Sequence, residues 1–274
     1  MIEHFIIRNK LGTELIDLQS WQDGFIAIDK EPKHWRKDFS AHSLGLFFTK
    51  GNENNGISAG QEWVERLIQT LIGSPFIFKE AEIEHASKVD NYRGGQRMQD
   101  LAIWGECSGK SVFMAVEAKV LESFDRTIIE AYNNALEYKK EENPRSKKDK
   151  RIEDLIARFF PAKLPTDEKV CNLRYQLLHY VAASQQEGFS LVESKKGLNE
   201  RKQADIVVLP ILVFRTPHYF EDEEQAKANK QDYLSCISQI GFEKSSQLKF
   251  DGNDVYVQYD GSRVTYSIYA EIDL

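Results

Sequence analysis

The stretch DLAIWGECSGKSVFMAVEAK (Asp100–Lys119) decides the fold of this chain. It contains two apolar runs, within Gln99–Gly105 and Ser111–Val120, joined by a short polar turn that contains glycine. Runs of this length, rich in β-branched and aromatic residues and closely joined, are typical of neighbouring antiparallel strands. We therefore expect a β-hairpin at the centre of the protein.

Three charged residues lie on this hairpin. Strand side chains alternate between faces, which places Glu117 and Lys119 side by side on one face, where Asp100 from the neighbouring strand can join them. A Glu-x-Lys pair alone is common on exposed strands and carries little information. Here the flanking apolar residues place the pair in a core. Two carboxylates and an ammonium group in a core indicate a site for metal-dependent phosphodiester hydrolysis.

The segment before the hairpin predicts a capped helix and a first strand. Ser58 and Gln61 form a capping-box pattern, and the helix is expected to end at Gly73 and Pro75. The apolar stripe of this helix comprises Val64, Leu67, Ile68, Leu71 and Ile72. A strand is expected at Phe76–His85. One face of that strand carries three acids, Glu80, Glu82 and Glu84. We interpret them as an exposed stripe or edge protection, with metal binding as the less favoured alternative.

Two helices and a buried strand are expected after the hairpin. Asp125 can cap the first helix, and the second is expected at Glu168–Gln186. The inward face of this second helix should carry Val170, Leu173, Leu177 and Val181. Asp205–Phe214 is almost continuously apolar, as in a strand covered on both faces. Pro210 within it predicts a bulge or an edge position.

The two ends of the chain add smaller elements. Near the N-terminus, Ser40 is a candidate cap for a helix whose apolar face carries Ala41, Leu44 and Phe48. The tail is expected to form a helix at Glu223–Ile240 and a hairpin of Asp254–Tyr259 with Arg263–Ile272. We thus expect an N-terminal cap segment at 1–50, a core at 51–216, and a C-terminal helix and hairpin packed on the core at 217–274.

Composition sets broad limits. The 274 residues are 41% hydrophobic, enough for an ordinary core, and no segment has the apolar length that a membrane span needs. A soluble, cytoplasmic protein is expected. Three distant cysteines indicate neither a disulfide framework nor a zinc site. The net charge of −7 argues against binding nucleic acid by bulk electrostatics, but it does not exclude a nuclease that binds cations through carboxylates. The basic run Lys139–Arg151 is interpreted as a solvated helix end and loop.

The element order and the placement of the acids resemble the PD-(D/E)xK nuclease superfamily, which includes restriction endonucleases, repair nucleases and defence effectors. Four segments are similar to an uncharacterised bacterial family placed in that superfamily: His34–Phe48, Arg93–Gly105, Val116–Phe124 and Arg174–His179. The resemblance spans roughly residues 20–215. It implies an α/β restriction-endonuclease-like core in which helices flank a central mixed sheet, in the order αβββαβ.

The resemblance assigns roles to the hairpin. Asp100 corresponds to the first acid, and Glu117 and Lys119 to the second half of the motif, while Gln99 replaces the proline that gives the superfamily its name. Both acids and the main-chain carbonyl of Ala118 would bind Mg²⁺ or Mn²⁺, whose preferred ligands are oxygens. The ion would polarise the phosphate and activate water. Lys119 would position that water or stabilise the transition state.

Two helical positions are further candidates. Members of the superfamily often carry a glutamate on the helix before the first strand. Here Glu65 flanks the apolar stripe, whereas Glu62 lies nearly opposite it, so Glu65 is preferred over Glu62, with a solvated helix acid as the alternative. On the later helix, Gln176 is the candidate polar residue that holds the site or a phosphate. His179 projects from the opposite face by helical spacing and is not expected to be catalytic.

The resulting hypothesis is a metal-dependent endonuclease that hydrolyses DNA; a setting in restriction or antiphage defence is implied only by the resemblance. Arg93, Arg97 and Arg174 are the candidate nucleic-acid contacts. Two alternatives stay open: an inactive nuclease-fold module that binds nucleic acid or a partner protein, and an RNase. A homodimer or an activating partner is compatible with each of them, and no membrane partner is expected.

Overall fold

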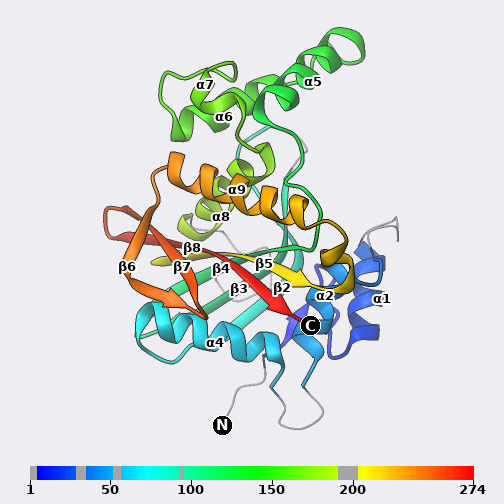
Figure 1. Ribbon diagram of the computed structural model, residues 1–274, viewed down its shortest axis with the longest axis vertical. Coiled ribbons are helices and arrows are strands. Elements are labelled where there is room, and N and C mark those ends of the chain that lie inside the picture. The colour runs from blue at the N-terminus through cyan, green and yellow to red at the C-terminus, as the bar shows by residue number, and fades with distance from the viewer. Residues whose placement is uncertain (1–4, 29–34, 52–56, 93–95, 191–202) are drawn as a thin grey trace.

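The protein is a mixed α/β structure with helices on both faces of one mixed sheet (Figure 1). The computed structural model describes residues 5–28, 35–51, 57–92, 96–190 and 203–274. Within these ranges, eight strands lie in the order β1-β2-β3-β4-β5-β8-β7-β6. The strands are β1 (Ile7–Arg8), β2 (Ile77–Ser87), β3 (Arg97–Cys107), β4 (Lys110–Lys119), β5 (Ile206–Arg215), β6 (Glu243–Phe250), β7 (Asn253–Asp260) and β8 (Arg263–Asp273).

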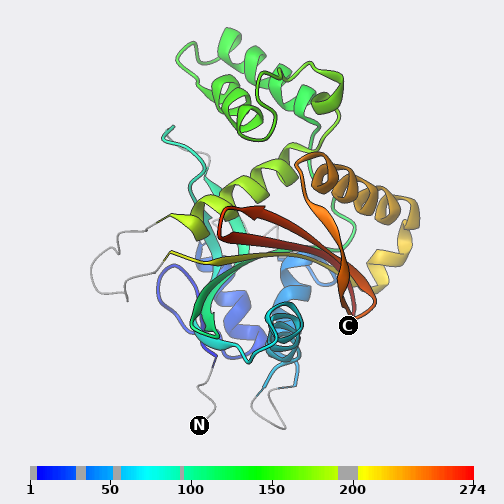
Figure 2. The ribbon, with the colours of Figure 1, turned by 90° about the vertical axis from the view of Figure 1, so that its left-hand side faces the viewer.

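The helices form layers on the two faces of the sheet. They are α1 (Leu18–Ile28), α2 (Ser40–Thr49), α4 (Ala59–Ile72), α5 (Ile128–Glu141), α6 (Lys148–Phe159), α7 (Glu168–Cys171), α8 (Tyr175–Phe189) and α9 (Glu223–Gln239), with a 3₁₀ turn η2 (Pro217–Glu221). Helices α1, α2 and α4 cover one face, α8 and α9 cover the other, and α5 to α7 lie beyond α8 (Figure 2). Each layer encloses its own apolar core, because the sheet separates the two clusters of buried side chains.

The central hairpin and the capped helix are confirmed. Strands β3 and β4 are antiparallel neighbours, paired from Leu101 with Val116 to Cys107 with Lys110. Helix α4 begins at a Ser58 side chain that accepts a hydrogen bond from the Gln61 N–H. It ends at Gly73, whose φ of 81° is the left-handed conformation that glycine adopts without a steric penalty.

The two other predicted caps are wrong. Helix α2 is preceded by Phe39, and the N–H of Ser40 donates instead to a Glu122 carboxylate oxygen, 3.1 Å away. Helix α5 is capped by Thr127 in a reciprocal capping box with Glu130 rather than by Asp125. At α2 the hydrogen bond comes from Glu122, which is distant in the sequence. At α5 the Thr127–Glu130 capping box, a local pattern, takes the place of Asp125.

The expected helix at 168–186 is interrupted. Its four inward residues are buried as predicted, but Val170 belongs to α7, Leu177 and Val181 belong to α8, and Leu173 lies between the two helices. Between them Arg174 is extended and forms a β-bridge with Thr127. The N–H of Tyr175 donates to the Arg126 carbonyl across this bridge. The sequence therefore predicted the helices on both sides correctly, but not the interruption at Arg174, which is caused by pairing with residues 126–127.

Pro210 lies neither at a bulge nor at an edge, so that prediction is wrong. Strand β5 runs between β4 and β8, parallel to both and without a shift in register. In this register the missing Pro210 N–H would have donated to the Ala115 carbonyl of β4. The buried hydroxyl of Tyr180 on α8 donates to that carbonyl instead, at 2.6 Å. A side chain thus replaces the hydrogen bond that proline removes.

Three elements escaped prediction. Helix α1 begins after Asp17, whose carboxylate accepts a hydrogen bond from the Ser20 N–H at 2.7 Å. The charged start of α6 concealed its apolar positions Ile152, Leu155 and Ile156, and β6 is mostly exposed and polar. The hairpin of β7 and β8 is confirmed. Strand β8 pairs with β5 from Val264 to Asp273, so the tail continues the central sheet.

Candidate active site

Strands β3 and β4 part at the predicted site. Their last pair is Leu101 with Val116. Beyond it, Arg97–Gln99 remain paired with β2, while Glu117–Lys119 remain paired with β5. We call this gap, between residues 97–100 and 117–119, the fork. Polar groups can therefore lie in the middle of the sheet, while the outer side of each strand stays paired with its other neighbour.

Asp100 lies in the fork and replaces the lost strand pairing. One of its carboxylate oxygens accepts a hydrogen bond from the Ala118 N–H, at 2.7 Å. In an extended strand the N–H and C=O groups of a residue point to the same side, so the Ala118 carbonyl also faces the fork. Both oxygen groups predicted for this part of the site therefore face the same gap.

Glu117 is the centre of a buried network. Only 2% of the residue is exposed, and one carboxylate oxygen lies 3.1 Å from the Lys119 Nζ and 2.8 Å from the Gln176 Nε2. The other oxygen pairs with the Arg97 guanidinium. The Gln176 Oε1 lies 3.4 Å from Lys119, so this amide of α8 bridges the acid and the base. The predicted residues Glu117, Lys119 and Gln176 are thus in contact.

The two carboxylates differ in acidity. Burial and the negative charge of Glu117 raise the pKa of Asp100 to about 7, and Arg97 and Lys119 offset this only in part. Burial also favours the neutral form of Glu117, but Arg97 and Lys119 outweigh it and lower the Glu117 pKa. Paired acids whose environments separate their pKa values are typical of catalytic sites.

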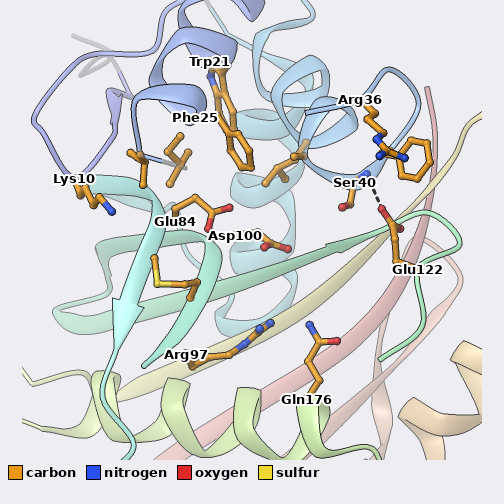
Figure 3. A pocket seen from close by; sticks show the side chains of 16 residues that line it. Lys10, Trp21, Phe25, Arg36, Ser40, Glu84, Arg97, Asp100, Glu122 and Gln176 are labelled. Atoms are coloured by element: carbon orange, nitrogen blue, oxygen red, sulfur yellow. Dashed lines mark hydrogen bonds between the residues drawn. The ribbon is translucent and has the colours of Figure 1, made fainter. Parts of the chain in front are cut away.

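A cavity of about 750 Å³ opens from the fork toward α1 and α2. Its lining combines the Asp100 and Glu84 carboxylates with the basic residues Lys10 and Arg36 and apolar side chains such as Phe25. Figure 3 shows the Asp100 and Glu84 side chains pointing into it from the sheet, with Arg97 and Gln176 approaching from the side of α8. The cavity leaves open space beside the acids.

Glu84 is a site residue that the sequence pattern did not reveal. It lies opposite Asp100, between the pairs Ile83 with Leu101 and His85 with Gln99. The interpretation of its face as an exposed stripe is wrong here, because Glu84 is half-buried and lines the cavity. Its φ of 49° is left-handed, which costs about 1–2 kcal/mol for a residue other than glycine. Backbone conformation of this kind has no signal in a strand sequence.

Comparison with known proteins identifies a family. Residues 16–259 match a domain of unknown function, DUF6946. The chain belongs to this family. The match contains the fork and also α9, β6 and most of β7, so the DUF6946 domain extends beyond the segments that carry the nuclease resemblance. No curated protein and no solved structure matches the chain.

The other predicted candidates of this DUF6946 domain lie apart from the cavity or outside the described residues. Glu65 of α4 accepts a hydrogen bond from Gln61 at 3.0 Å and is not among the cavity residues. Arg174 pairs with Asp232 of α9 at 2.7 Å. Arg93 lies outside the described residues. Of the three arginines, the structure places Arg97 in the fork.

The donor set of the fork suits a small hard cation. Across the ranges that the structure describes, no group of three or more His, Cys, Asp and Glu side chains is gathered closely enough to hold a metal ion. The fork instead offers two carboxylates and a carbonyl. Mg²⁺ commonly binds one or two carboxylates and keeps several waters. The raised pKa of Asp100 also fits, since a nearby cation would favour its charged form.

Two general expectations can be compared with the structure. All three cysteines are free, and Cys107 and Cys236 are buried. None of the helices in the described parts of the chain is both long and apolar enough to cross a membrane.

Proposed function

We propose that this protein is a metal-dependent nuclease that hydrolyses phosphodiester bonds of DNA at the fork. The observation that carries the proposal is the contact network of Glu117 with Lys119 and Gln176, beside an Asp100 carboxyl of raised pKa, at the mouth of a large cavity. A stable core has no need of this arrangement, because apolar residues in place of buried ion pairs are often as stable.

The order of the elements supports membership of the PD-(D/E)xK superfamily. Helix α4 precedes three antiparallel strands, β2 to β4, and the chain returns through α8 to β5, which lies parallel to β4. This is the order αβββαβ that the resemblance implies, with α5 to α7 as additional helices. The acids and the lysine lie where the three-stranded unit meets the returning strand.

The chemistry follows from the groups in the fork. Asp100, Glu117 and the Ala118 carbonyl would hold Mg²⁺ or Mn²⁺, which supplies positive charge to a phosphate oxygen and makes a water more acidic. Lys119 keeps its ammonium group beside Glu117 through the contacts that Glu117 and Gln176 provide. A fixed ammonium group stabilises the negative charge that develops on phosphorus without reorganising during the reaction.

The cavity accounts for access of the substrate. A volume of about 750 Å³ is in the range of ligand sites and accommodates a nucleotide, whereas a complete duplex is far wider. Phosphate would meet Lys10 and Arg36, and apolar side chains such as Trp21 and Phe25 are present for a base or sugar. This supports a strand that enters locally unpaired or at an end.

The deciding experiment compares native protein with Lys119→Ala in plasmid-nicking and oligonucleotide-cleavage assays, with DNA and RNA, in Mg²⁺, Mn²⁺ and EDTA. Lys110→Ala is the matched control, because Lys110 is exposed at the other end of β4. We expect cleavage that needs the metal and falls roughly 10²–10³-fold in Lys119→Ala, the usual effect of removing one preorganised charge donor. Lys110→Ala should cleave like native protein.

Other outcomes decide between the alternatives. Full activity of a folded Lys119→Ala, checked by circular dichroism and thermal unfolding, would refute the assignment of Lys119. Cleavage of RNA alone would make the protein an RNase. Absence of cleavage together with absence of Mg²⁺ or Mn²⁺ binding in calorimetry would favour an inactive binding module.

A further inference from the structure

A second, smaller cavity lies on the other side of α8, against α5 and α6. It encloses about 290 Å³. Its lining includes the basic residues Arg126, Lys148 and Arg151 and the acid Asp125. The other polar residues of the lining are Asn134, Tyr175 and His179. Three basic side chains line the cavity with one carboxylate, and Asp90 pairs with one of the three, Arg151. The remaining charge is positive and favours an anion.

His179 contributes a buried polar atom that has no partner. The residue is 8% exposed and stacks on Tyr175 with ring centroids 5.4 Å apart. Its Nε2 has no hydrogen-bond partner in the described part of the chain. Buried polar atoms are almost always hydrogen-bonded, and leaving one without a partner is destabilising. A ligand in the adjoining cavity would supply the missing bond.

The protonation state of His179 suits this role. Burial, followed by the positive charges of Arg97 and Arg151, lowers its pKa to about 4. The ring is therefore neutral near pH 7, and one of its nitrogens carries hydrogen. It can donate one hydrogen bond to an anion without adding a charge, while the lysine and arginines supply the attraction.

The basic side chains of the cavity are held in place by contacts at its rim. Two hydrogen bonds from the Arg151 guanidinium to Asp90, of 2.5 and 3.1 Å, fix the plane of that group. The Lys148 Nζ lies 3.9 Å from the centre of the Tyr138 ring. Positioned basic groups bind phosphate at a lower entropic cost than free ones.

The cavity is close to the fork. His179 lies three residues after Gln176 on α8, which is about 4.5 Å along the helix axis. Gln176 contacts Glu117 and Lys119. Helix α8 therefore contributes side chains to both the fork and the cavity from positions less than one turn apart, and the charge of Arg97 in the fork acts on His179.

We propose that this cavity is a phosphate subsite, which binds a backbone phosphate of the nucleic-acid strand next to the bond that is cut. The proposal rests on the nuclease function proposed above and adds how the strand is held. The sequence run Lys139–Arg151, interpreted as a solvated helix end and loop, thereby supplies two ligands, Lys148 and Arg151.

The first test is the salt dependence of binding. The dissociation constant of a fluorescent oligonucleotide is measured by anisotropy in EDTA, over a range of KCl concentrations, for native protein, Lys148→Gln and Lys150→Gln. Lys150 is the matched control, because it lies on α6 two residues away, pairs with Glu153 and does not line the cavity. Loss of one phosphate contact should reduce the slope of log K against log salt by about 0.7 for a single strand and about 0.9 for a duplex. We expect this reduction in Lys148→Gln and no change in Lys150→Gln.

The second test is His179→Phe, which keeps a stacked ring and removes the unpartnered nitrogen. We expect several-fold weaker oligonucleotide binding, an unchanged salt slope because the lost group is neutral, and an unfolding temperature equal to or above that of native protein. A lower unfolding temperature with unchanged binding would show a packing role and overturn the subsite.

A third arm separates this proposal from the nuclease function. Inorganic phosphate should raise the unfolding temperature of native protein and Lys150→Gln, but not of Lys148→Gln. Oligonucleotide binding with equal salt slopes in both lysine variants would overturn the subsite and leave the nuclease standing. Protection by phosphate without any oligonucleotide binding would overturn the assignment of a strand phosphate and the nuclease function together, and would leave a site for free phosphate.

Discussion

Strand β4 lacks a regular strand-to-strand hydrogen bond in two places, and a different kind of side chain supplies the missing partner in each. Toward β5, the Tyr180 hydroxyl donates to the Ala115 carbonyl where Pro210 offers no N–H. Toward β3, the Asp100 carboxylate accepts from the Ala118 N–H where the strands part. The two positions are three residues apart on the same strand.

The difference between these repairs separates structure from function. Tyr180 is 2% exposed and packed in the core, and its hydroxyl satisfies the buried Ala115 carbonyl. Asp100 brings a carboxyl that opens into a cavity beside a second acid. A neutral group would close the fork at a lower electrostatic cost. An acid at this position is what the proposed nuclease chemistry would need.

The largest effect should come from Asp100→Asn. The variant keeps the shape of the side chain and loses its charge, so the donor set for a cation is incomplete. We expect Asp100→Asn to lose several kcal/mol of transition-state stabilisation, which lowers the cleavage rate by about 10³-fold or more. Tyr180→Phe should retain activity within a few-fold, measured at a temperature where it is folded. Equal losses in the two variants would abolish the distinction between the two repairs.

The next effect concerns pH. The pKa of Asp100 is raised from 3.8 to about 7 in the folded protein, so its contribution to stability is complete below about pH 4 and is lost as the pH rises to about 7. Between pH 5 and pH 8, the free energy of unfolding of native protein should fall by about 1–3 kcal/mol more than that of Asp100→Asn.

Urea unfolding at both pH values measures this difference, and the titrating groups that do not interact with Asp100 cancel because the variant shares them. Mg²⁺ should restore part of the lost stability of native protein at pH 8 and have little effect on the variant. If, without metal, the free energies of unfolding of native protein and Asp100→Asn changed equally with pH, the pKa of Asp100 would be unshifted. The fork would then not differ from the Tyr180 position in this respect.

The smallest effect tests the neutral repair. Tyr180→Phe leaves the buried Ala115 carbonyl without its donor and should destabilise the protein by about 1–2 kcal/mol. Pro210→Ala restores an N–H to β5, so the double variant should recover part of that loss. A double-mutant cycle from thermal unfolding gives the coupling between the two residues, and a coupling near zero would refute the account of the repair.

The sequence alone determined much of the core and its acids. Apolar runs rich in β-branched and aromatic residues predicted β2 to β5, the caps and the apolar stripe predicted α4, and strand periodicity placed Glu117 beside Lys119. These features follow from local periods of 2 and 3.6 residues, which a single segment carries by itself. The contact of Gln176 with them agrees with a residue chosen through the nuclease resemblance.

The tertiary structure decided everything that depends on where separate segments meet. The parting of β3 and β4, the left-handed turn that brings Glu84 opposite Asp100, and the hydroxyl of Tyr180 at Pro210 are set by neighbours far along the chain. So are the acidity of Asp100 and the unpartnered nitrogen of His179, because burial and nearby charge fix both. The candidate site was therefore readable as a set of residue types, whereas the arrangement of those residues arises from long-range packing, which no local period encodes.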